Sequence, residues 1–92
     1  MYVPSAFSPD GGNNRNLTFM AYCTGAIEFH MYIFDRWGTL VYESADISQG
    51  WDGTINGLPA SQGVYVYRID YKTYDFLDLH KHTKTGSVTL IR

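Results

Sequence analysis

"GVYVYRIDYKT", residues 63–73, alternates between two kinds of side chain, which predicts a half-buried β-strand. The face expected to enter the core carries large side chains: Tyr65, Tyr67, Ile69 and Tyr71. The opposite face carries Val64, Val66, Arg68 and Asp70. Because the chain is 16% aromatic and each buried aromatic side chain removes about 150–250 Å² from water, these rings are expected to form the core.

The start of this strand resembles the corner signature of immunoglobulin-like sandwiches, in which Gly-x-Tyr-x-Cys opens a strand. Gly63 and Tyr65 fill the first two roles, and Tyr67 stands in place of the cysteine. We expect the Tyr65 hydroxyl to bond to upstream backbone and to pin the preceding loop to the sheet. Tyr67 is expected to fill the core volume that a disulfide would otherwise occupy.

Period-2 alternation recurs along the chain, and no segment shows a sustained helical period. Besides residues 63–73, strands are expected at 2–7, 17–23, 26–35, 39–44, 75–84 and 86–92. Turn residues cluster between them, including a reversal at Gly38. About seven short strands without helices predict an all-β fold: an immunoglobulin-like antiparallel β-sandwich forming a single domain over residues 1–92.

Composition narrows the function classes. A net charge of −2 argues against a nucleic-acid-binding protein, which would carry a basic surface. The last third of the chain is nevertheless mildly cationic. Cys23 is the only cysteine, so an intrachain disulfide and a thiol-rich metal site are excluded. The chain has no apolar run of about 20 residues, and its start lacks the regions of a signal peptide. We expect any export signal to lie elsewhere and Met1 to begin a fragment of a longer chain.

Two tryptophan–glycine clusters, residues 34–44 and 50–69, have two possible roles. In the favoured interpretation Trp37 and Trp51 plug the open ends of the sandwich, each beside a glycine that lets backbone approach the ring. In the alternative, Trp37 and Trp51 join Tyr32 and Tyr42 in an exposed platform for sugar rings or a partner protein.

The sequence offers only weak candidates for a metal site or a catalytic site. The loop "PDGGNNRN", residues 9–16, resembles a calcium loop, but Asp10 is its one carboxylate and Arg15 opposes a cation, so an Asx-rich turn is favoured. His80 and His82 share a strand face that could hold a transition metal, but solvated histidines are the better interpretation. No hydroxyl lies in a nucleophile motif. We expect no catalysis, no metal and no cofactor.

Four motifs, in order, resemble the gliding motility-associated C-terminal domain family, also called the type B sorting domain of the type IX secretion system. They are "VPSAFSPDGG", "FDRWGTLVYES", "GWDGTINGLPASQGVYVYRIDY" and "GSVTLIR", and together they reach from Val3 to Arg92. The matching positions that we expect to be structural are Trp37, Gly38, Gly50, Trp51, Asp52, Gly53, Gly63 and Tyr65. Near the start, Ser5, Asp10, Gly12 and Asn16 depart from the family pattern, so the resemblance does not extend to a cation site.

The resemblance implies a non-catalytic address module of a large secreted protein, often an adhesin. Such a module is recognised at the outer membrane, guides its cargo through the translocon with a partner outer-membrane barrel protein, and leaves it at the cell surface. We expect the final strand and neighbouring cationic residues to dock: Arg36, Lys84, Gly86, Val88, Thr89, Leu90, Ile91 and Arg92. Arg36 has a competing role, in which it stacks or pairs to hold the Trp37 turn. Alternative functions are a carbohydrate- or protein-binding adhesion module and a structural cap.

Overall fold

The computed structural model describes residues 1–9, 18–74 and 76–91, and over these it contains strands and no helix. The strands are β1 (Ala6–Phe7), β2 (Ala26–Phe34), β3 (Leu40–Ser44), β4 (Thr54–Ile55), β5 (Leu58–Pro59), β6 (Gly63–Tyr74) and β7 (Leu79–Leu90). The prediction of an all-β fold is confirmed.

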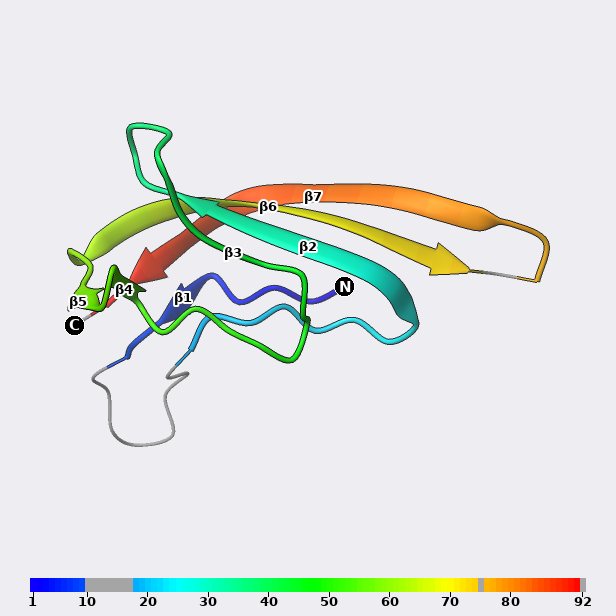
Figure 1. Ribbon diagram of the computed structural model, residues 1–92, viewed down its shortest axis with the longest axis horizontal. Coiled ribbons are helices and arrows are strands. Elements are labelled where there is room, and N and C mark those ends of the chain that lie inside the picture. Colours follow the sequence, from blue (N-terminus) through cyan, green and yellow to red (C-terminus); the bar gives the residue numbers. More distant parts are fainter. Residues whose placement is uncertain (10–17, 75, 92) are drawn as a thin grey trace.

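Two layers give the molecule its sandwich-like form. Five strands make one sheet in the order β1-β7-β6-β2-β3, and β4 pairs with β5 in a small hairpin. Figure 1 shows the N-terminal segment, residues 18–25 and the chain between β3 and β4 lying along one side of the long strands. Single bridges, Tyr2 to Tyr22 and Phe19 to Trp51, hold this second layer together. The strands expected at 2–7 and 17–23 are thus reduced to β1 and these bridges.

The strand β7 departs from the prediction in two ways. It runs without a register break opposite β6 from Leu79 to Leu90, so the separate strands expected at 75–84 and 86–92 are wrong. Gly86 stays in the ladder opposite Tyr67 rather than breaking it. In addition β7 pairs with β1 in parallel, through Ala6 with Thr89 and Phe7 with Leu90, which makes the sheet mixed.

The core lies between the two layers. Tyr65, Tyr67 and Ile69 are buried on one face of β6, as the alternation predicts. Trp51 is fully buried at the centre, with its ring centroid 5.4 Å from that of Phe7 and 5.0 Å from that of Tyr65. Its indole Nε1 donates a hydrogen bond of 2.9 Å to the Thr54 carbonyl. Trp51 is therefore buried, as the favoured interpretation expects, but it lies within the core rather than at an open end of the sandwich.

The loop before β6 is pinned by the predicted tyrosine corner. The Tyr65 hydroxyl donates a hydrogen bond of 2.8 Å to the Ser61 carbonyl, four residues upstream. Because this bond is local and partly buried, it fixes the direction in which the chain enters β6.

We expect Tyr65→Phe to lower the free energy of unfolding by about 1 kcal/mol, because it removes this hydrogen bond and leaves the ring in place. Urea unfolding followed by circular dichroism measures the loss. Tyr71→Phe is the matched control, since Tyr71 lies six residues further along the same face of β6, is partly buried and packs through its ring. Equal losses in the two variants would contradict a special role for the corner.

Candidate recognition surface of the sheet

The C-terminal part of β7 is built into the sheet. Val88 and Leu90 are fully buried, so these two expected docking residues belong to the core. Thr89 and Ile91 donate backbone hydrogen bonds of 2.9 Å to the carbonyls of Ser5 and Phe7. Thr89 is half-buried, Ile91 is 45% exposed, and Arg92 lies outside the described residues. A partner that contacts this end of the folded domain meets Thr89 and Ile91 rather than Val88 and Leu90.

Gly86 and Lys84, two further expected docking residues, lie in the middle of β7. A Cβ at position 86 would come 2.5 Å from the hydroxyl oxygen and 2.7 Å from Cζ of Tyr67, so the tyrosine ring covers this glycine. Burial raises the pKa of the Tyr67 hydroxyl above its usual 10.0, consistent with a ring held inside the fold. Lys84 is half-buried and pairs with Ile69, on the face of the sheet that turns toward the second layer.

The turn between β2 and β3 places Trp37 in solvent. Trp37 is 79% exposed, so the prediction that it plugs an end of the sandwich is wrong. The turn is closed instead by the Asp35 carboxylate, which accepts hydrogen bonds of 2.9 Å from the backbone N–H groups of Trp37 and Thr39. Gly38 takes a φ of 84°, as expected for this reversal. Backbone and carboxylate hold the turn, so its indole is not needed for packing.

Arg36 lies between this turn and the start of β6. Its guanidinium carbon stands 5.0 Å from the centroid of the Trp37 ring. Its Nη2 atom would be 3.6 Å from a Cβ at Gly63, so the side chain also reaches β6. This stacking is the second of the two roles considered for Arg36, and it leaves the cation at the surface beside an exposed aromatic ring.

In the second tryptophan–glycine cluster, the backbone at residues 50 and 51 lies directly against that of Phe19. Trp51 and Phe19 exchange hydrogen bonds of 2.8 and 3.0 Å, and a Cβ at Gly50 would come 2.9 Å from the Phe19 carbonyl oxygen. The Asp52 carboxylate accepts from the Thr54 backbone and hydroxyl at 3.0 and 2.6 Å. Gly53 and Gly63 take positive φ angles of 81° and 149°. Since Trp51 is buried, the alternative, an exposed platform of Tyr32, Trp37, Tyr42 and Trp51, does not form.

One end of the open sheet face is apolar. Phe34 of β2 pairs with Leu40 of β3 and with Val66 of β6, and Val64 pairs with Thr89 of β7, so these side chains share a face. Leu40, Val64 and Val66 are 43%, 53% and 45% exposed. We call this surface the outer-face patch: Phe34, Leu40, Val64, Val66 and Thr89. Exposed Ile91 follows it at the end of β7, and the Arg36–Trp37 turn adjoins it.

Sequence reasoning placed Val64 and Val66 on the face opposite the core without assigning them a role. The signal was present, because a strand with one solvated face ordinarily carries polar residues there, whereas this strand carries two valines. Leu40 and Phe34 could not be added from the sequence, since their position depends on strand pairing.

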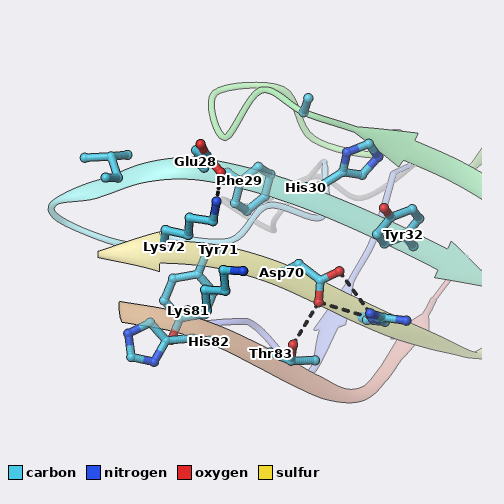
Figure 2. A pocket seen from close by; sticks show the side chains of 13 residues that line it. Glu28, Phe29, His30, Tyr32, Asp70, Tyr71, Lys72, Lys81, His82 and Thr83 are labelled. Atoms are coloured by element: carbon cyan, nitrogen blue, oxygen red, sulfur yellow. Dashed lines mark hydrogen bonds and ion pairs between the residues drawn. The ribbon is translucent and has the colours of Figure 1, made fainter. Parts of the chain in front are cut away.

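The other end of the same face is a polar groove of about 710 Å³, shown in Figure 2. Lys72 lies 2.7 Å from Glu28, Arg68 lies 3.1 Å from Asp70, and the Thr83 hydroxyl donates to Asp70 at 2.9 Å. Burial acts to raise the pKa of Asp70, but hydrogen bonds from Thr83 and Arg68 and the nearby positive charges outweigh it and lower that pKa. Lys72 and Arg68 are thus paired with Glu28 and Asp70, and Lys81 adds a further cation to the lining of the groove.

The histidines do not converge on a metal. The rings of His80 and His82 are 6.5 Å apart, His82 stacks on Tyr71, and its Nε2 lies 2.9 Å from the Thr73 hydroxyl. Among the described residues no three His, Cys, Asp or Glu side chains are grouped closely enough to hold a metal ion. The candidate calcium ligand Asp10 falls outside those residues. In the same part of the chain, no helix has the length and apolar character needed to cross a membrane.

Comparison with known proteins identifies the family. No curated protein and no solved structure matches the chain. Residues 1–90 match the family model described as CHU_C, the type IX secretion signal domain. Domains of this family act as sorting signals and are non-catalytic in general, so a protein that carries one is secreted or displayed at the cell surface. The resemblance found in the sequence is thus confirmed, and the chain belongs to the CHU_C type IX secretion signal domain family.

Proposed function

We propose that the secretion machinery recognises the sorting signal as a folded surface rather than as a linear segment. The part that it binds is the outer-face patch together with the Arg36–Trp37 turn. The observation that carries this proposal is the cluster of half-exposed apolar side chains on the sheet face opposite the core. Solvent-facing strand positions are usually polar, and a contiguous apolar patch on a small domain marks an interaction site.

The composition of this surface suits a protein partner. The patch offers apolar area for burial, and the adjoining turn adds an aromatic ring and an arginine, residue types enriched at interface hot spots. The partners that we propose are the outer-membrane translocon of the type IX system and an associated outer-membrane barrel protein. In this role the domain accompanies a large cargo, such as an adhesin, to the outer surface of the cell and catalyses no reaction there.

Of the expected docking residues, Arg36, Thr89 and Ile91 lie on or beside this surface. Gly86, Val88 and Leu90 support it from within, because they set the position of β7 against β6. Lys84 lies toward the other face and is not part of the proposed surface. The proposal therefore moves the recognition site from the final strand as a whole to the open face that this strand shares with β6, β2 and β3.

We expect Val64→Asp to reduce export of a folded fluorescent reporter fused to the domain by about tenfold, because a carboxylate would be buried against the partner without a counter-charge. The fusion carries its own signal peptide, and the secreted fraction is measured in a host with type IX machinery. Ile27→Asp is the matched control, since Ile27 is 56% exposed at the far end of β2 and lies outside the patch. Both variants are checked for folding by circular dichroism. If Val64→Asp exports as well as Ile27→Asp, the outer-face patch is not the recognised surface.

A further inference from the structure

Within residues 1–9, 18–74 and 76–91, most of the outer edge of β7 has no strand partner. On one side β7 pairs with β6 at every position from Leu79 to Leu90. On the other side its partner among the described residues is β1, and that pairing is confined to Thr89 and Leu90. Figure 1 shows β1 beside the C-terminal end of β7 only, while the rest of β7 forms the border of the sheet. We call the stretch from Leu79 to Ser87 the open edge.

Backbone hydrogen bonds identify the groups that the open edge presents. The N–H groups of Thr89 and Ile91 point toward β1, since they donate to the carbonyls of Ser5 and Phe7. Backbone direction alternates along a strand, and β7 shows no register shift against β6. The N–H and C=O groups that face outward along the open edge therefore belong to Lys81, Thr83, Thr85 and Ser87.

The open edge has few of the features that block strand addition. It contains no proline and no β-bulge, and it is long. Its protective feature is charge: Lys81 and Lys84 lie on this strand, with no acidic residue between Leu79 and Ile91. Edge lysines discourage pairing with a second copy of the same edge, because like charges would then face each other. The same lysines favour an incoming strand of opposite charge.

An apolar tip lies at the start of the open edge. Phe76 and Leu77, in the connection between β6 and β7, are 93% and 88% exposed, and Tyr74 is 67% exposed. A strand laid along β7 would end beside this tip and could bury it. Apolar side chains exposed this completely at the end of a paired hairpin are typical of a surface that contacts another protein.

We propose that the open edge of β7 binds an extended, acidic polypeptide segment of a protein partner as an added β-strand. Main-chain hydrogen bonds to Lys81, Thr83, Thr85 and Ser87 supply the affinity, and carboxylates on the added strand face the cationic side chains. The open edge lies outside the outer-face patch. Binding at the open edge can therefore be tested independently of recognition of that patch.

The test uses the 92-residue chain and a capped dodecapeptide of alternating threonine and glutamate as the probe, with a threonine–lysine peptide as its counterpart. Amide hydrogen exchange is measured by NMR. We expect the acidic peptide to slow exchange at Thr83, Thr85 and Ser87 by about tenfold at low salt and the lysine peptide to have no effect. Thr85→Pro is expected to abolish the slowing, because it removes an N–H group that faces the open edge while leaving the hydrogen bonds to β6 in place. Thr85→Val keeps that N–H group and is expected to preserve the slowing.

Lys81→Glu provides a second variant that leaves the backbone donors intact, and it is expected to weaken binding of the acidic peptide several-fold. Two results overturn the proposal. One is unchanged amide exchange in the presence of saturating acidic peptide. The other is equal binding to the folded Thr85→Pro variant, which would show attraction by charge without strand addition.

Discussion

Trp51→Ala is expected to lower the free energy of unfolding by about 3–5 kcal/mol, the loss typical of removing a large aromatic side chain from a packed core. Trp51 is fully buried, its ring touches Phe7 and Tyr65, and its Nε1 is bonded to the Thr54 carbonyl. It also joins the layers, since its backbone bridges to Phe19 in the second layer while its ring packs on β6. Domains of this size have only about 5–15 kcal/mol of stability in total, so much of the fold would be lost.

Trp37→Ala is the matched control for this experiment. Trp37 is 79% exposed, and its contact is the stacking with Arg36, so we expect a loss within about 1 kcal/mol. Chemical denaturation of both variants, followed by tryptophan fluorescence and circular dichroism, gives the comparison. Similar losses in the two variants would mean that the exposed indole also packs, contrary to the structure.

Gly86→Ala is expected to destabilise the domain by about 1–3 kcal/mol through overpacking. The added methyl group would stand 2.5 Å from the Tyr67 hydroxyl oxygen and 2.7 Å from Cζ. Tyr67 cannot move away freely, because it is 7% exposed and its ring packs 5.6 Å from that of Phe19. Either the ring or β7 must shift, and both movements disturb the same core.

A double-mutant cycle isolates this contact. In a Tyr67→Phe background the hydroxyl oxygen is absent, so Gly86→Ala should cost clearly less, with a coupling of about 0.5–2 kcal/mol. Ser87→Ala, one residue further along β7, is exposed and should change stability by no more than about 0.5 kcal/mol. Additive effects of the Tyr67 and Gly86 substitutions would show that the glycine is required for another reason.

Local features were predictable from the sequence. The alternation in residues 63–73 identified the buried face of β6, because burial of a strand follows directly from the period of its side chains. The tyrosine corner was predictable for the same reason, since the Tyr65 hydroxyl reaches a carbonyl only four residues upstream. Both are decided by short stretches of chain.

Features that depend on pairing between distant segments were not predictable. Trp37 and Trp51 occupy similar tryptophan–glycine clusters, but one turn is closed by Asp35 and the other is bridged to Phe19, which lies far away in the chain. The sequence predicted separate strands at 75–84 and 86–92, whereas β7 runs on through Gly86, which the ring of Tyr67 on β6 covers. The full burial of Val88 and Leu90, two of the residues expected to dock, was not predictable for the same reason, because it depends on the order of strands in the sheet.

The central claim is that the secretion machinery recognises the folded surface of the domain. The most direct test is to measure the secreted fraction of a folded reporter fused to the Trp51→Ala domain. This variant retains every residue of the outer-face patch and of the final strand, but it loses the core that holds them in place. Immunoblots confirm that the fusion remains intact, and hydrogen exchange gives the folded fraction at the temperature of the assay. We predict that export falls in proportion to the folded fraction. Export at the level of the unmodified domain, from a fusion shown to be unfolded, would contradict the account and would make a linear segment the signal.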